Sequence, residues 1–375
     1  MGNCIVYIQE QHPNFTESFL RAEINELYSR NYDVAVVTPK IIPECLNECA
    51  YREHIFASTW SDDPTIKLDN LTAEVKKQNP RYLHSHFITE AKRYTLPVAE
   101  RLNIPFGFMV HAYDIWLRGA RIEPEEINRI ANHPLCVIAA CEGSKHRNYL
   151  LWCGVPEEKI IVTPNCVDER CLPEPKTQYA NSVKKIMAVG RPVIKKGFFV
   201  AIDALRLLHL RGYNEMELEI VFGSDLQRDL APILMQYAKN FPFIRFTPKT
   251  PHPQILQKIK DADVLIMPCI VSVDGDSDGI PTVLSEAMLL GTPVICTDVG
   301  SVTDLVIPEK TGFLARVGDS ASLAERITDV DSLLKQTTEL TQLIARAKRQ
   351  AAKHSALSSV NSLAKHLEIV LGRFC

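Results

Sequence analysis

The 375-residue sequence lacks a strong excess of either charge, with 42 lysines and arginines against 45 aspartates and glutamates and a formal net charge of -3. So balanced a chain has no general attraction for nucleic acid or anionic lipid, and we expect neither as a partner. It also lacks an apolar run near the ~18 residues that a membrane span needs, and its start, MGNCIVYIQEQHPNF, has no basic region followed by an apolar one. We therefore expect no integral membrane segment, a cytoplasmic location and small-molecule partners; the sequence carries no signal of an oligomeric state.

Cysteine pairs with metal or redox spacing are lacking too. The 11 cysteines are an odd number, which argues against a complete disulfide framework. Close pairs such as Cys45 and Cys49 do not have the CxxC spacing of zinc or redox sites. Others, such as Cys4, Cys136 and Cys296, lie in apolar runs, where a thiol packs as a small hydrophobic group. We expect buried free thiols.

Short apolar runs alternate with helix-period segments along most of the chain, and this alternation predicts βαβ units and parallel sheets. The strand candidates are residues 4–9, 33–39, 82–87, 106–111, 136–141 and 159–165 in the first half, and 185–191, 218–224, 243–248, 262–269, 292–299 and 312–318 in the second. The predicted class is α/β, with two Rossmann-like doubly wound domains that face a central cleft.

A polar, proline-bearing passage interrupts the alternation and marks the domain boundary. We predict an N-terminal domain at residues 1–170, a linker at 171–184 and a C-terminal domain at 185–354. A last helix at 355–375 is expected to pack back on the N-terminal domain. Ligands of doubly wound sheets bind beyond the carboxyl ends of the strands, so the loops that follow the strands should hold the site.

The usual phosphate-binding fingerprints are absent, since no GxGxxG follows a strand and no GxxxxGK[ST] occurs. A basic pair offers another way to hold a diphosphate. Arg191 is the last residue of the strand candidate KIMAVGR, and Lys195 and Lys196 precede Gly197 and a predicted helix. Cations that converge near a helix N-terminus neutralise anionic oxygens. The alternative is that these residues are ordinary surface charges.

The stretch DGDSDGIPTVLSEAM at residues 274–288 resembles a calcium loop only in its first half. Asp274, Asp276 and Asp278 occupy positions 1, 3 and 5 of that pattern, but position 12, a bidentate glutamate in such loops, is Ser285. Pro281 also stands where the ligating backbone should curl around the ion. We therefore reject calcium, which leaves a polar turn or an anion site.

As an anion site, the same stretch can present the backbone N–H groups of Gly279, Ile280 and Thr282 to phosphate oxygens at the start of a helix. Pro281 has no N–H and shapes the turn. About one turn into that helix, Glu286 can accept both hydroxyls of a vicinal diol such as ribose, each bond to a charged group contributing about 1.5–3 kcal/mol. Asp278 would approach sugar hydroxyls.

These segments resemble a known family. GRPVIKKGF and DGIPTVLSEAMLLGTPVICTDVGSVTDLVIPEKTGFLARVGD resemble the retaining GT-B glycosyltransferases of the family 4 type (glycosyltransferases group 1), which include sucrose and mannosyl transferases. The sequence also looks like bacterial polysaccharide or aminoglycoside-pathway sugar transferases. HSHF at 84–87, VHAYD at 110–114 and PNCVD at 164–168 extend the resemblance over nearly the whole chain. It implies a GT-B fold and transfer of a hexose or N-acetylhexosamine from a nucleotide-sugar, UDP being the commonest donor.

The resemblance also implies roles for single residues. An Arg and a Lys five apart grip the diphosphate in this family, and a Glu-x7-Glu element grips the donor sugar and ribose. Arg191 and Lys196 match the basic pair, Glu286 matches the second glutamate, and Asp278 stands where the first is expected. Asp278, one methylene shorter, and Cys166, in place of a glycine, are departures that we interpret as tuning. The implied donor site comprises Gly190, Arg191, Lys196, Asp278, Gly279, Ile280, Pro281, Thr282 and Glu286.

The mechanism that the family implies is front-face attack, in which the departing phosphate oxygen takes the acceptor proton. The protein then mainly stabilises charge on the leaving diphosphate, so no metal and no cofactor are expected. His111 matches the family's active-site histidine and should contact the transferred sugar, unless it is a buried structural histidine. We expect His84 and His86 to face opposite sides of their strand, and so not to join His111 as metal ligands.

The acceptor should bind to strand-end loops of the N-terminal domain. Glu10, Glu17, Glu90 and Asp114 come from three such loops, and with His111 they form the predicted acceptor site. The expected acceptor is a small polyol, an aminocyclitol or a saccharide. Carboxylates suit a polyol, and suit an aminocyclitol or amino sugar better because its ammonium groups would pair with them. Glu17 and Glu90 could instead simply favour helix N-termini.

Other classes of protein remain in competition. A nucleotide-sugar-binding protein without turnover would be stabilised by nucleotide but transfer nothing, and a GT-B epimerase would act on the donor without an acceptor. A phosphorylase would need a lysine-bound pyridoxal phosphate and generally a much longer chain.

Overall fold

The structure, a computed structural model, describes residues 4–13, 17–116, 122–223 and 230–372. The chain divides into two compact units. The first comprises Met1–Asp168 with Ser355–Cys375, and the second Glu169–His354. Residues 171–184, where the sequence predicts a linker, therefore belong to the second unit. There the Lys176 N–H donates to Leu290 O (2.8 Å) and the Val183 N–H donates to Asp331 (2.8 Å).

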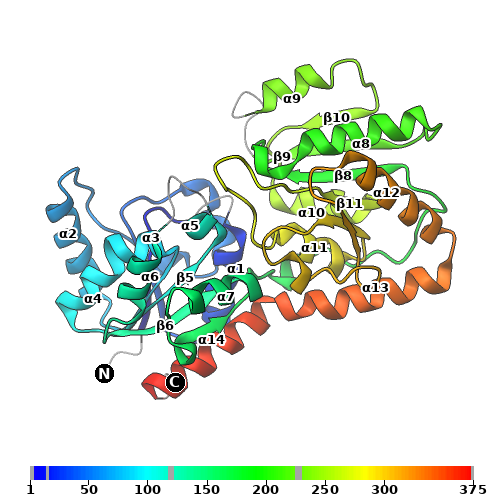
Figure 1. Cartoon of the computed structure of the whole chain (residues 1–375). Helices are drawn as coiled ribbons and strands as arrows, with labels where there is room; N and C mark the ends of the chain where they lie inside the picture. The colour runs from blue at the N-terminus through cyan, green and yellow to red at the C-terminus, as the bar shows by residue number, and fades with distance from the viewer. Residues whose placement is uncertain (1–3, 14–16, 117–121, 224–229, 373–375) are drawn as a thin grey trace. The chain divides into compact units, whose positions relative to one another are not determined.

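The first unit is built on a seven-stranded parallel sheet with the order β3-β2-β1-β4-β5-β6-β7 (Figure 1). Its strands are β1 Cys4–Ile8, β2 Val34–Thr38, β3 Ile55–Ala57, β4 Pro80–His86, β5 Phe106–Val110, β6 Cys136–Cys141 and β7 Ile160–Val162. Most of these strands are apolar along their length because helices cover both faces of a doubly wound sheet.

Helices cover both faces of this first sheet (Figure 1). They are α1 Ser18–Ser29, α2 Pro64–Lys77, α3 Ile88–Glu90, α4 Leu96–Leu102, α5 Ala112–Trp116, α6 Pro124–Ala131, α7 Ser144–Trp152 and α14 Ala356–Leu371. Successive residues of β1 point into different cores. Tyr7 packs with side chains of α1 and α14, whereas Val6 packs with side chains of α2, α4, α6 and α7.

The second unit repeats this design with six parallel strands in the order β10-β9-β8-β11-β12-β13. The strands are β8 Lys185–Gly190, β9 Glu217–Phe222, β10 Ile244–Thr247, β11 Val264–Met267, β12 Val294–Thr297 and β13 Phe313–Ala315. The helices are α8 Phe198–Leu210, α9 Ala231–Tyr237, α10 His252–Asp261, α11 Thr282–Leu290, α12 Ser320–Leu334 and α13 Thr337–Ala351. One core lies under α8, α9 and α12 and another under α10 and α11.

The structure confirms the α/β class and the two doubly wound parallel sheets. Each of the twelve predicted strands coincides with an observed one, and the sequence missed only β3, a three-residue strand at the sheet edge, among the described residues. The cysteines that the structure describes are free, and all but Cys171 are buried. None of the helices in the described ranges combines the length and the hydropathy that a membrane crossing requires.

Candidate nucleotide-sugar and acceptor sites

The loop after β8 carries the predicted diphosphate cations. Arg191 follows the strand and is exposed, a short 3-10 turn spans Ile194–Lys196, and Gly197 leads into α8. Gly197 has a left-handed backbone, with φ of 66°. A Cβ atom added there would lie 1.8 Å from the carbonyl oxygen of Pro268, just after β11. Glycine therefore allows the loops after two neighbouring strands to meet.

This contact gives a testable prediction. Gly197→Ala should lower the free energy of unfolding by about 3–5 kcal/mol, because the new methyl group cannot share space with a backbone carbonyl. Gly318→Ala is a matched control: its φ is 73°, but a Cβ atom there would meet nothing within 4 Å. It should cost only the left-handed strain, about 1–2 kcal/mol. Thermal or urea unfolding of both variants checks this, and equal losses would show that the close approach is unimportant.

Lys196 reaches across this contact to Asp278, the residue at the place of the family's first glutamate. Lys196 Nζ lies 2.7 Å from Asp278 Oδ2, and Lys195 Nζ lies 3.6 Å from Asp278 Oδ1. The Cys269 thiol also donates to Asp278 Oδ2 at 3.2 Å. Burial alone would raise the pKa of Asp278, but the two lysines outweigh it and hold the pKa at about 2. The carboxylate is thus ionised and paired with Lys196, one of the two predicted phosphate-binding cations, and with Lys195.

The remaining aspartates of the DGDSDG stretch are also occupied. Asp276 Oδ1 accepts from Lys195 Nζ at 2.9 Å, and Asp274 accepts from the Ser272 hydroxyl. The rejection of a calcium loop is consistent with these partners, since Asp276 and Asp278 each face a lysine.

The turn after Asp278 is held by the loop that follows β12. A Cβ atom on Gly300 would lie 2.2 Å from Asp278 O and 2.3 Å from Gly279 O. The Ser301 N–H also donates to Gly279 O at 3.2 Å. This packing fixes the path of the chain through the buried Ile280 and into α11, whose N-cap is Pro281 and whose first residue is Thr282. The predicted backbone donors therefore lie at the N-terminus of a nine-residue helix.

Glu286 is the fifth residue of α11 and is only 4% exposed. Its Oε1 lies 2.7 Å from Nε2 of His252, the first residue of α10. Sequence reasoning missed His252, because the 34 residues that separate it from Glu286 hide the contact. The structure thus joins Lys196 to Asp278 and Glu286 to His252, and all four belong to the second unit.

In the first unit, His111 directly follows β5 and is 4% exposed. Its Nδ1 lies 2.6 Å from Glu142 Oε1, and its Nε2 lies 3.1 Å from His86 Nδ1. Burial alone would lower the pKa of His111, but the hydrogen bond and charge of Glu142 raise it overall. Both ring nitrogens are engaged, so a ring hydrogen bond to a sugar would require one of these partners to be released.

Asp114 supports the turn that carries His111. Its Oδ2 accepts from the His111 N–H at 2.9 Å, and its Oδ1 accepts from the Thr89 hydroxyl at 3.2 Å. The side chain is fully buried and does not line the cavity that the other predicted acceptor residues share.

That cavity, of about 280 Å³, is a candidate acceptor site in the first unit. It is lined by Glu10, Gln11, Glu17, Lys40, Trp60 and Glu90. Three of the predicted carboxylates therefore converge. Burial, with the nearby charges of Glu17 and Glu10, raises the pKa of Glu90 well above its usual range. Glu90 Oε1 accepts from the Glu10 N–H at 3.3 Å, while its buried Oε2 has no partner among the described residues.

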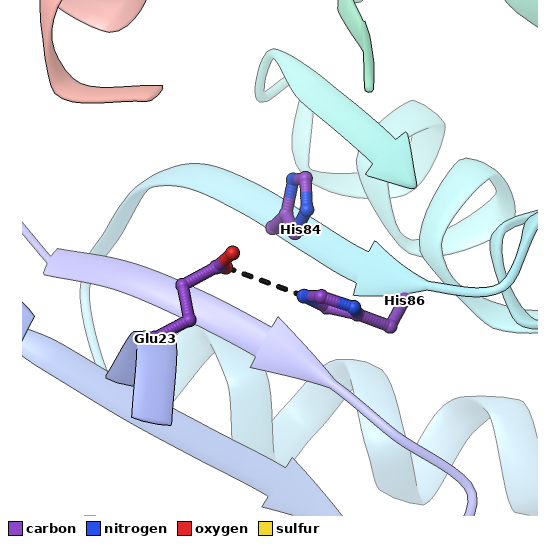
Figure 2. A group of neighbouring side chains, drawn as sticks. All are labelled: Glu23, His84 and His86. Atoms are coloured by element: carbon purple, nitrogen blue, oxygen red, sulfur yellow. Dashed lines mark hydrogen bonds and ion pairs between the residues drawn. The ribbon is translucent and has the colours of Figure 1, made fainter. Parts of the chain in front are cut away.

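The expectation that His84 and His86 face opposite sides of their strand is wrong. Residues two apart on a strand share a face, and Figure 2 shows both rings on the side of β4 that faces Glu23. The three side chains are of types that bind metals, and their ligand atoms lie within 4.8 Å of one another. However, Glu23 Oε1 already accepts from Tyr7 Oη at 2.7 Å and lies 3.2 Å from His86 Nε2. We therefore assign no metal there.

Models of two glycosyltransferase families match the chain, one in each unit. A model described as Glycosyltransferase Family 4 matches residues 16–170, and one described as Glycosyl transferases group 1 matches residues 174–350.

Among curated proteins, the chain is 33% identical over 202 residues to WcaL of Escherichia coli K12, whose name assigns it to colanic acid biosynthesis. That alignment covers 54% of this chain and 48% of WcaL. It is 30% identical over 175 residues to the amylovoran biosynthesis glycosyltransferase AmsK of Erwinia amylovora, covering 47% and 42% of the two chains. The chain thus spans about half the length of these curated relatives.

Solved structures resemble the chain over nearly its whole length. Sucrose-phosphate synthase from Thermosynechococcus elongatus matches with a TM-score of 0.77 at 17% identity, covering 98% of each chain. Anabaena HepE in complex with UDP matches with a TM-score of 0.76 at 17% identity, covering 99% of this chain and 100% of that one. These likenesses show a shared fold. With a family model over each of its two doubly wound units, the chain belongs to the group 1, family 4 type glycosyltransferases and has the GT-B fold.

Proposed function

We propose that this protein is a retaining glycosyltransferase that moves a hexose or N-acetylhexosamine from a nucleotide-sugar, UDP-linked, to a hydroxyl of a saccharide acceptor. The observation that carries the proposal is the meeting of Lys196 and Asp278 at the carboxyl ends of β8 and β11, beside the N-terminus of α11. Cations at the end of a doubly wound sheet, together with the N–H groups at the start of a helix, suit a diphosphate. Because the chain belongs to a glycosyltransferase family, we expect this diphosphate to be part of a nucleotide-sugar.

In this proposal the donor site works by electrostatic stabilisation. Arg191 and Lys196 neutralise the charge that develops on the leaving diphosphate, and the backbone of Gly279 to Thr282 adds hydrogen-bond donors that need no rearrangement. A leaving-group oxygen takes the acceptor's proton as the new glycosidic bond forms on the same face. No metal and no cofactor take part.

A saccharide acceptor, rather than an aminocyclitol, fits the cavity in the first unit. The raised pKa of Glu90 favours the protonated form of its carboxyl group, which can donate a hydrogen bond to a hydroxyl. Trp60, 50% exposed, adds an aromatic surface to the same cavity. The names of WcaL and AmsK, which refer to the biosynthesis of colanic acid and of amylovoran, also favour a saccharide.

The test is a thermal-shift panel of UDP, GDP and ADP and their sugars, with and without magnesium, followed by transfer assays on saccharide acceptors. A nucleotide at 100 times its Kd should add about 2.7 kcal/mol to the free energy of unfolding. We expect UDP and a UDP-sugar to stabilise the protein without magnesium, and transfer to retain the donor's anomeric configuration. Stabilisation without transfer to any acceptor would favour a binding protein, and donor isomerisation without acceptor would favour an epimerase.

The acceptor cavity gives a prediction that separates the two acceptor classes. Glu90→Ala should raise the acceptor KM about 10-fold, the value of one hydrogen bond, and leave the donor KM unchanged. Glu90→Gln should have a much smaller effect, because an amide still donates to a hydroxyl. A cationic acceptor would instead make Gln as harmful as Ala.

The control for this prediction is Glu100→Ala, an exposed glutamate of α4, which should leave both KM values unchanged. An unchanged acceptor KM in both Glu17→Ala and Glu90→Ala would show that the acceptor does not bind in this cavity.

A further inference from the structure

Five buried polar side chains of the first unit form one continuous hydrogen-bonded chain. It runs from Glu142, just after β6, through His111 and His86 to Glu23 on α1 and Tyr7 on β1. The successive distances are 2.6, 3.1, 3.2 and 2.7 Å. No member is more than 4% exposed, so water offers them little alternative hydrogen bonding and the pairing within the chain must be complete.

The number of protons in this chain follows from its geometry. Glu142 raises the pKa of His111 and opposes the lowering of the pKa of His86, as an anion does, and an ionised carboxylate only accepts hydrogen bonds. The two outer nitrogens, His111 Nδ1 and His86 Nε2, must then each carry a proton for Glu142 and Glu23. The inner bond joins His111 Nε2 to His86 Nδ1 and needs one more. Three protons are therefore required. Two neutral imidazoles carry only two, which would leave two lone pairs facing each other in one bond.

We propose that His111 and His86 share one extra proton, which Glu23 and Glu142 retain, so that the pair carries a positive charge near pH 7.5 at the end of β5. Glu23 and His86 are then positioning residues for His111. The charge can lie on either ring, because transfer of the central proton from His111 Nε2 to His86 Nδ1 preserves all three hydrogen bonds.

The charges that surround the pair agree with this assignment. Burial alone would raise the pKa of Glu23, but the two histidines of β4 and Tyr7 lower it to about 2, so Glu23 is ionised. His111 also faces the charges of Asp114 and Glu17, which raise its pKa. Burial lowers the pKa of His86 and outweighs the opposing charges of Glu23 and Glu142. The extra proton thus resides mainly on His111 Nε2, in the bond to His86 Nδ1.

His84 lies beside this hydrogen-bonded chain but is not part of it. Its Nδ1 lies 2.9 Å from Tyr82 Oη, and burial lowers the pKa of His84 to about 3, so it stays neutral. A divalent cation among Glu23, His84 and His86 is the main competing account. To bind Glu23 Oε1, the cation would have to displace the two donors from which that oxygen already accepts hydrogen bonds, Tyr7 Oη and His86 Nε2.

The experiment is 15N NMR of the full chain labelled at histidine, with the two rings assigned from His111→Asn and His86→Asn. Near pH 7.5 we expect three of the four ring nitrogens of His111 and His86 to be protonated. Two protonated nitrogens would overturn the proposal, as would stoichiometric zinc in the purified protein. This readout needs no substrate and is independent of the proposed function.

A nearly isosteric variant distinguishes charge retention from a merely structural role. In Glu23→Gln the amide can donate to His86 Nε2, so two ring protons then fill all three bonds. We expect the extra proton to be lost at a pH lower by about 1–3 units than in the natural protein. Glu26→Gln, on the same helix but paired with Arg30, should keep three protons at pH 7.5. Three protons in both variants at every pH would contradict retention by Glu23.

Discussion

Lys196→Ala is expected to lower kcat/KM for sugar transfer by about 10²–10³, the effect of removing one preorganised donor to a developing anion. The ammonium group lies at the end of β8 beside the N-terminus of α11, where the leaving diphosphate should acquire its charge. Its pKa is raised, because Asp278 outweighs the effect of burial, so the charge is present at every pH suitable for the assay. Initial rates at several concentrations of the UDP-sugar measure the loss.

The variant should still fold. Asp278 loses its nearest cation but keeps Lys195 at 3.6 Å and the Cys269 thiol at 3.2 Å, so the buried carboxylate is not left unpaired. Lys258→Ala, which removes a lysine paired with Glu219 on the same domain, should retain full activity. Full activity of Lys196→Ala, with a thermal unfolding curve that shows it folded, would refute the assignment of the donor site.

The fold could be predicted from the sequence because the buried strands and the helices of a doubly wound domain each have a recognisable local sequence pattern. Strands buried on both faces appear as short apolar runs, and the helices between them keep an amphipathic period. The missed strand β3 has neither signal: it is three residues long, pairs only with β2 at the sheet edge and is partly exposed. An edge strand such as β3 is stabilised by pairing with a neighbouring strand, here β2, and a pattern within the three residues themselves cannot indicate that pairing.

The candidate site was predictable to the extent that its parts lie in short motifs. Lys196 and Asp278 were chosen from two such motifs, and they meet although 82 residues separate them. His252 and Glu23 were missed because their roles consist of contacts across 34 and 63 residues, with no motif of their own. The wrong expectation for the histidines of HSHF was an error of strand parity and could have been avoided.

Glu286→Gln is expected to give the second large effect. Two probes, UDP and inorganic pyrophosphate, show which part of the nucleotide the side chain contacts. If the carboxylate accepts both ribose hydroxyls, loss of its charge should weaken UDP binding by about 10- to 150-fold, which corresponds to about 1.5–3 kcal/mol. Binding of inorganic pyrophosphate should not change, because that probe has no ribose. Lys196→Ala should weaken both probes. Isothermal titration calorimetry with UDP and pyrophosphate on both variants therefore separates the two halves of the donor site.

The local structure makes Glu286→Gln a clean substitution. The glutamine can still accept from His252 through its own Oε1, so the contact between α10 and α11 need not break. Glu325→Gln, on the exposed face of α12, provides a control of equal charge change and should bind both probes like the natural protein. Equal weakening of UDP and pyrophosphate by Glu286→Gln would place this carboxylate's influence on the phosphates and not on the pentose. Unchanged UDP binding would separate Glu286 from the nucleotide altogether and leave it as the structural partner of His252.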